Sequence, residues 1–148
     1  MVERFRRRPI LAFCAAIAIA ATVAMIGCAS APVGGPITIE CQVFYRASPS
    51  EAFQESATTL GPGNGSHKEE FGDLTFSATF LDDPGEGPAL SLVVSDATSQ
   101  NEITRQLYQI NRAQGLHDQF VGGHGFTGLN YVFHPTTSAE LQDFCLAK

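Results

Sequence analysis

The sequence contains no tryptophan, and positive charge is scarce: nine lysines and arginines stand against fifteen aspartates and glutamates in 148 residues. Four of the nine cations but only one of the acids lie in residues 1–27, so the remaining 121 residues carry five cations, fourteen acids and a net charge of −9. Nucleic acids and anionic lipids are bound by clustered lysine and arginine. Because lysine and arginine are scarce, a basic patch that binds nucleic acids or anionic lipids is not expected.

Motifs of nucleophilic catalysis are also missing. The chain has no G-x-S-x-G turn, no S-x-x-K pair and no cysteine–histidine signature. The adjacent carboxylates Glu69-Glu70 and Asp82-Asp83 would point to opposite faces of a strand, so neither pair makes an acid/base couple. The glycine-rich stretch "GGHGFTG" at 122–128 lacks the lysine of a phosphate loop. We therefore expect no enzyme activity and no cofactor.

A run without charges extends from Ile10 to Gly27 and follows four arginines between positions 4 and 8. A basic start, an apolar stretch and small residues beyond it are typical of a secretory signal peptide, here residues 1–27. An uncleaved membrane anchor is the alternative, since 18 apolar residues can just span a bilayer. Alanine dominates the run, which favours the removable signal.

The end of this run, Met25-Ile26-Gly27-Cys28, resembles the lipobox of bacterial lipoproteins, with methionine where that family prefers leucine. The resemblance implies that the signal is cut before Cys28, that its thiol receives diacylglycerol, and that the new amino terminus is acylated, for example with palmitate. Such a protein is held in the cell-envelope membrane by its acyl chains. Cleavage after the A-x-A site at 29–31 would instead give a freely secreted protein.

Two cysteines, Cys41 and Cys145, remain near opposite ends of the exported part, because Cys14 leaves with the signal and Cys28 is the lipidation candidate. An even pair in an exported protein predicts a disulfide, which would stabilise the fold by roughly 4–5 kcal/mol in the chain-entropy model. Metal ligation and free thiols are the alternatives.

The rest of the chain predicts an all-β domain, a small antiparallel β-sandwich or barrel over residues 37–148, after a flexible tether at 28–36. Apolar and polar residues alternate across a hairpin at 72–96, the clearest local pattern. Further strands are expected at 37–46 and 129–134, and a closing segment at 139–148 turns Leu141, Phe144 and Cys145 inward. The cysteines make the first and last strands candidate neighbours.

Three segments give mixed signals. Ser48 to Glu51 could begin a helix, whereas the threonine-rich end of the same segment favours a strand. Residues 61–70 are expected to form a glycine-rich loop. Residues 102–114 fit either a helix or a strand, with a slight preference for a strand. The acidic tip at 82–86 lacks a calcium-loop pattern and is expected to be a solvated turn.

Candidate binding residues gather late in the chain. His117, His124 and His134 lie within eighteen residues and could ligate zinc or copper, although their spacing differs from the usual ligand patterns. The segment around Gly123, His124, Phe126 and Tyr131 combines aromatic rings, a histidine and a flexible backbone. If the domain has a recognition surface, we expect it there.

A lipid-tethered β domain with one long-range disulfide is similar in architecture to bacterial lipoprotein inhibitors of lysozyme. Gly128 and Tyr131 keep the spacing of that family's serine-glycine-x-x-tyrosine loop, but Thr127 stands in place of the serine. The function expected from the sequence is a non-catalytic envelope lipoprotein with a binding or structural role. Extracytoplasmic metal binding and secreted enzyme inhibition are the alternatives.

Overall fold

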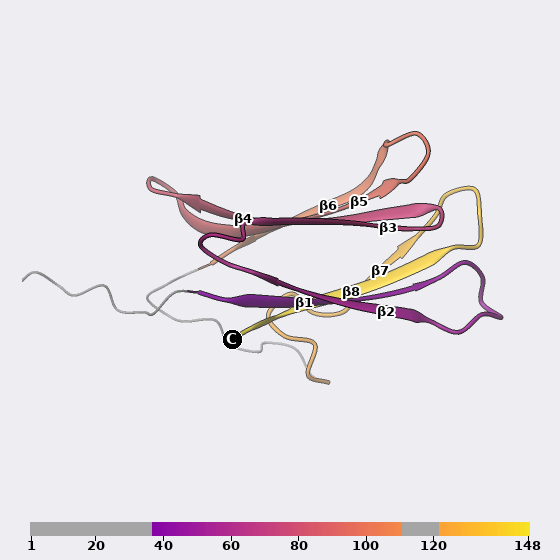
Figure 1. The fold of residues 1–148 in the computed structure, drawn as a ribbon, viewed down its shortest axis with the longest axis horizontal. Helices are drawn as coiled ribbons and strands as arrows, with labels where there is room; N and C mark the ends of the chain where they lie inside the picture. Colours follow the sequence, from indigo (N-terminus) through magenta and orange to yellow (C-terminus); the bar gives the residue numbers. More distant parts are fainter. Residues whose placement is uncertain (1–36, 111–121) are drawn as a thin grey trace, which may run out of the picture. The chain divides into compact units, whose positions relative to one another are not determined.

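The computed structural model describes residues 37–110 and 122–148, which form two four-stranded antiparallel sheets (Figure 1). The first has the strand order β2-β1-β8-β7 and the second the order β3-β4-β5-β6. The strands are β1 (Ile39–Arg46), β2 (Gln54–Leu60), β3 (Ser66–Phe71), β4 (Leu74–Asp83), β5 (Gly87–Asp96), β6 (Glu102–Gln109), β7 (Asn130–Phe133) and β8 (Glu140–Ala147). The expected all-β sandwich with one disulfide is confirmed. Within the two described ranges, no helix is long and apolar enough to cross a membrane.

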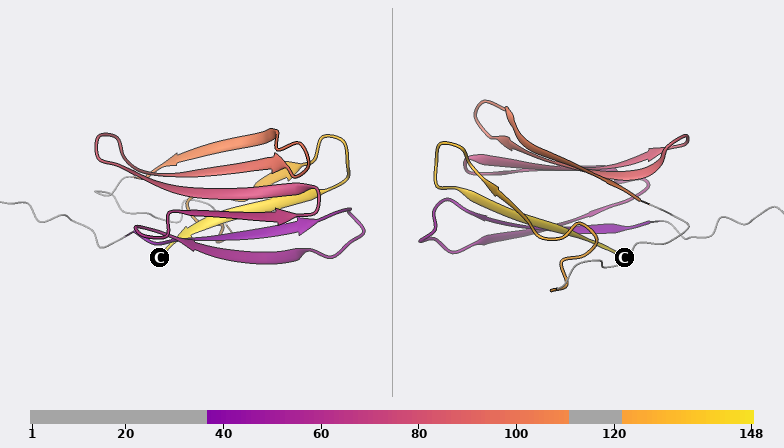
Figure 2. Two further views of the ribbon diagram at one scale, coloured as in Figure 1. Left: turned by 45° about the horizontal axis from the view of Figure 1, so that its top comes forward. Right: turned by 180° about the vertical axis from the view of Figure 1, so that it is seen from behind.

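The two sheets lie as separate layers, and the core fills the space between them (Figure 2). Every second residue of each central strand points inward, as the two-residue period of a strand requires. The buried side chains include Ile39, Cys41, Val43, Leu141 and Cys145 from the first sheet and Leu74, Phe76, Leu90, Leu92 and Val94 from the second. Full burial of one such aliphatic or phenylalanine side chain stabilises the fold by about 1.5–3 kcal/mol.

The predicted hairpin is present as β4 and β5, with Phe76 opposite Val94 and Phe80 opposite Leu90. Its acidic tip is an ordinary turn, because Asp83 Oδ1 accepts hydrogen bonds from the backbone N–H groups of Glu86 and Gly85 at 2.9 and 2.7 Å. These two bonds lower the pKa of the Asp83 carboxyl. The turn geometry alone therefore accounts for an acidic residue at this position.

Two of the uncertain segments are strands. Residues 54–60 form β2, which pairs with β1, and residues 102–109 form β6, which pairs with β5. If a helix began at Ser48 and continued through this segment, the backbone N–H and C=O groups on this edge of β1 would lack the hydrogen-bond partners that β2 supplies. Residues 111–114, the end of the second segment, lie outside the described residues.

The expected loop over residues 61–70 is wrong in its second half, because Ser66–Phe71 form strand β3 at the edge of the second sheet. This strand is almost wholly polar, and only Phe71 is buried. An edge strand needs few apolar residues when its neighbour supplies the backbone partners, as β4 does here from Thr79 to Leu74. Its pairing, rather than its hydrophobicity, makes it a strand.

The closing segment also needs one correction. Leu141 and Cys145 point into the core as expected, but Phe144 lies on the outer side of the sheet and is half-buried. Residues three apart on a strand face opposite ways, so Leu141 and Phe144 cannot both point inward. The inward position between Leu141 and Cys145 belongs to Asp143, which is only 1% exposed.

The first and last strands are neighbours, and Cys41 lies directly opposite Cys145 in their antiparallel register. Their sulfur atoms are bonded, which confirms the predicted disulfide across 104 residues of sequence. The bridge therefore joins two adjacent strands of one sheet on its core side.

Candidate functional site: an aromatic sheet face

Aromatic side chains cover the outer side of the β2-β1-β8-β7 sheet. We call the set Phe44, Phe53, His124, Tyr131, Phe133 and Phe144 the aromatic face. Outward positions of an antiparallel sheet are usually polar. Here Phe133 is 61% exposed, Tyr131 56% and Phe53 36%, whereas Phe44, Phe144 and His124 are half-buried beside them. The face is thus a concentration of exposed aromatic surface on one layer of the sandwich.

Ring contacts connect most of this face. Phe44 on β1 stacks on Phe144 of β8 with 6.1 Å between ring centroids. Phe53, just before β2, meets Phe44 edge-on at 6.4 Å, and His124 meets Phe144 edge-on at 5.2 Å. The guanidinium of Arg46 lies over the Phe53 ring, 4.7 Å from its centroid. Four rings and one cation therefore support one another across two strands and two loops.

Planar polar groups alternate with these rings because of the strand register. Tyr131 lies opposite Gln142, which lies opposite Phe44. In the next row, Phe133 lies opposite Glu140, which lies opposite Arg46. Each row across the sheet therefore places an amide, a carboxylate or a guanidinium beside an aromatic ring.

The polar groups of the second row are held in place by one another. Glu140 Oε2 accepts hydrogen bonds from Arg46 Nε at 2.8 Å and Nη2 at 2.5 Å, and its Oε1 accepts one from Gln142 Nε2 at 2.5 Å. Burial would raise the pKa of the Glu140 carboxyl, but the hydrogen bonds from Gln142 and Arg46 outweigh burial and lower it. Glu140 is therefore a buried, ionised carboxylate whose two oxygens are engaged by Arg46 and Gln142.

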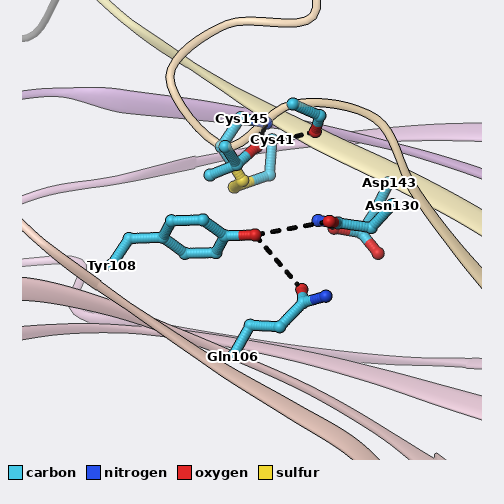
Figure 3. The surroundings of a disulfide bond; sticks show 8 residues. Cys41, Gln106, Tyr108, Asn130, Asp143 and Cys145 are labelled. Carbon is cyan, nitrogen blue, oxygen red and sulfur yellow. Dashed lines mark hydrogen bonds between the residues drawn. A yellow bond between two sulfur atoms is a disulfide. The ribbon is translucent and has the colours of Figure 1, made fainter. Parts of the chain in front are cut away.

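The segment that carries His124 is attached to β8 at the disulfide (Figure 3). Cys145 N–H donates to Thr127 Oγ1 at 2.8 Å, and Cys145 O accepts from Phe126 N–H at 3.1 Å. Just before Phe126 the chain passes so close to β8 that a Cβ on Gly125 would lie 2.0 Å from Cys145 O, and the φ of Gly125 is +63°. Only glycine fits both conditions.

Because of this attachment, the recognition segment expected from the sequence lies partly on the aromatic face and partly in the core. His124 and Tyr131 lie on the aromatic face, and Gly123 is exposed beside His124. Phe126 is only 7% exposed and packs edge-on against Tyr108 in the core, with 6.1 Å between centroids. Phe44, Phe53, Phe133 and Phe144 were missed by sequence reasoning. The one signal was the aromatic residue at an outward position of a predicted strand, which applies to Phe44 and Phe133; Phe53 lies just before β2, and Phe144 was expected on the core side.

A polar cluster around the buried carboxyl of Asp143 lies behind the face, between the two sheets (Figure 3). Asn130 Nδ2 donates to Asp143 Oδ1 at 3.0 Å, and the Tyr108 hydroxyl donates to Asn130 Oδ1 at 3.3 Å. The same hydroxyl lies 3.4 Å from Gln106 Oε1. Burial raises the pKa of Asp143 to about 6, against the smaller lowering effect of Asn130. The cluster joins β6 to β7 and β8 across the sandwich.

His134 makes a second link between the sheets. Its Nε2 donates to Asp96 Oδ2 at 2.8 Å, while its Nδ1 accepts from the backbone N–H groups of Thr137 and Thr136 at 3.1 and 3.3 Å. Both ring nitrogens are therefore engaged. Backbone donation from Ser99 and then the bond from His134 lower the pKa of Asp96 to about 2.

The described part of the chain contains no group of three His, Cys, Asp or Glu side chains that could hold a metal. His117, one of the three histidines of the expected metal site, lies outside the described residues, as do Cys28 and the whole signal segment. The three-histidine site and the lipidation of Cys28 thus stay predictions.

Comparison with protein-family models, with curated proteins and with solved structures finds no match to this chain. The surface chemistry of the domain itself is therefore the guide to its function.

Proposed function

We propose that the protein is a non-catalytic envelope lipoprotein, anchored through acylated Cys28, whose β-sandwich binds a ligand outside the membrane on the aromatic face. The observation that carries this proposal is the exposure of Tyr131 and Phe133 beside the connected rings of the same sheet. Exposed aromatic side chains next to an arginine are the composition typical of binding surfaces.

The position of the most exposed rings along the sheet supports a ligand beyond the membrane surface. The tether enters β1 at Ile39, whereas Phe133 and Arg46 lie at the other end of the sheet. Seven residue steps along β1 span about 23 Å. Residues 28–36 add at most about 30 Å of reach when extended. The anchored end and the exposed rings are thus separated by the length of the domain.

The anchor is tested by the intact mass of the N-terminal peptide from the membrane fraction of expressing bacteria. An acylated Cys28 is expected, and C28A should move the protein to the soluble fraction. A terminus at Pro32 would contradict the anchor and make the protein a secreted one.

The binding face is tested by photocrosslinking in the same cells. The Phe133→p-benzoylphenylalanine variant is expected to give an adduct, because position 133 lies on the face. Position 107 is the matched control, since Leu107 is 62% exposed on the edge strand of the other sheet. Equal adducts at both positions, or none at 133, would overturn the binding role of the face.

A further inference from the structure

We infer that the aromatic face binds the sugar rings of an uncharged polysaccharide. The inference rests on the proposed function, since it names the ligand of the same face. The inference that the ligand is a sugar follows from the alternation of aromatic rings and planar polar groups on this face. Tyr131, Gln142 and Phe44 form one row across the sheet, and Phe133, Glu140 and Arg46 form the next.

Sugar rings have the matching chemistry. The C–H groups on one face of a pyranose carry a slight positive charge and pack on the electron-rich faces of aromatic rings. The hydroxyl groups at its edge donate to carboxylate and amide oxygens and accept from guanidinium and amide N–H groups. In each row the exposed ring supplies the first half, and the accessible polar groups are Gln142 in one row and the Arg46 guanidinium in the other, because Glu140 is only 5% exposed.

A protein partner fits this pattern less well. The buried centre of a protein–protein interface is depleted of charged residues, which collect at the rim. Here the Arg46–Glu140 ion pair lies within a row, between Phe133 of β7 and the Phe53 ring that Arg46 covers. The Glu140 side chain is already only 5% exposed, but a quarter of the Arg46 side chain is in contact with water, and a dry protein surface would remove that guanidinium from water without supplying new partners. Sugar hydroxyls, in contrast, would extend its hydrogen bonds.

Charge favours an uncharged chain over an acidic one. Residues 28–148 carry a net charge of −9, and the Arg46 cation of the face is already paired with Glu140. An anionic polymer would be repelled by the domain as a whole. A neutral polymer meets no such penalty.

The arrangement of the rings suits an extended ligand. Centroids of Phe144, Phe44 and Phe53 follow one another at 6.1 and 6.4 Å across neighbouring strands, and His124 extends the row beyond Phe144. A polysaccharide that crosses the strands can thus contact several rings in succession, so that weak single contacts add along one chain.

The experiment is affinity gel electrophoresis of the full-length lipidated protein in detergent, with hydroxyethylcellulose, mannan or arabinogalactan in the gel. At least one of these neutral polysaccharides is expected to retard the protein. Y131A/F133A should weaken that retardation at least tenfold. Both side chains are more than half exposed, so the variant should keep the circular dichroism spectrum of the wild type. L107A, an equally exposed apolar truncation on the other sheet, should bind as the wild type does.

Three results would overturn the inference. The first is that none of the three polysaccharides retards the protein. The second is that Y131A/F133A is retarded as strongly as the wild type. The third is that the adduct crosslinked at position 133 is a protein, shown by its loss on protease treatment. In the first and third cases, a position-133 adduct that is absent at 107 would still support the proposed binding face. The failure of the sugar inference is therefore distinguishable from the failure of the proposed function.

Discussion

Asp143 accepts a hydrogen bond from the side-chain amide of Asn130, its direct partner across strands β7 and β8, inside the sandwich. The carboxyl is 1% exposed, and its burial raises the pKa from an ordinary 3.8 to about 6. A raised carboxyl pKa means that the folded state resists ionisation more than the unfolded state does. The penalty is absent below about pH 4, grows between pH 4 and 6, and is complete above pH 6.

Replacing this carboxyl with an amide of the same shape should therefore stabilise the protein at neutral pH. We expect D143N to raise the free energy of unfolding by about 3 kcal/mol at pH 7.5, the equivalent of roughly two pKa units. At pH 4 wild type and variant should differ little, since Asp143 is then protonated. Urea unfolding at both pH values measures the difference, and an equal effect at both would show that ionisation of Asp143 is not the cause.

The link between Asp96 and His134 should act in the opposite direction. The pKa of Asp96 is lowered to about 2 by Ser99 and His134, so its contribution to stability is present above about pH 4 and is lost as the pH falls toward 2. D96N is expected to be less stable than the wild type at pH 6 and similar near pH 2. Acid unfolding followed by circular dichroism checks this. A constant deficit from pH 6 to pH 2 would assign the loss to packing instead of charge.

Removal of the disulfide should lower stability substantially. The bridge closes 104 residues of sequence, for which the chain-entropy model gives about 4–5 kcal/mol. We expect C41A/C145A to lose about that amount in urea unfolding at pH 7. Reduction of the wild type with dithiothreitol should reproduce most of the loss. If the variant unfolds at the wild-type urea concentration, the bridge does not constrain the unfolded chain.

Two neighbouring glycines provide a matched test of the attachment at β8. Gly123 and Gly125 both have positive φ, but a Cβ on Gly123 would meet nothing within 4 Å, whereas one on Gly125 would clash with Cys145 O. G123A should lose about 1–2 kcal/mol from backbone strain alone. G125A should lose clearly more, because Phe126 N–H must also leave Cys145 O. Thermal unfolding of both variants gives the comparison, and equal losses would contradict the close packing.

Several features were predictable because they depend on local pattern. The β4–β5 hairpin follows from alternating apolar and polar residues around a turn, and the Cys41–Cys145 bridge follows from the cysteine number of a chain that is expected to be exported. Strand β3 was missed since its polar sequence has no apolar alternation, and its partner β4 supplies the pairing. Phe144 was wrongly placed inside because the apolar character of a side chain does not reveal which face of its strand it occupies.

The sequence by itself determined the fold class, the disulfide and the acidic character of the domain, because alternation, cysteine number and charge are properties of a linear chain. Only the tertiary structure decided where the outward aromatic residues meet. Phe144 lies 100 residues after Phe44 in the sequence, and the two become neighbours, with Phe53 beside them, through the order β2-β1-β8-β7. The burial of Asp143 depends on both sheets, since Asn130 of β7 donates to it and Tyr108 of β6 in turn donates to Asn130. Strand order is set by the packing of the whole chain, and no single segment encodes it.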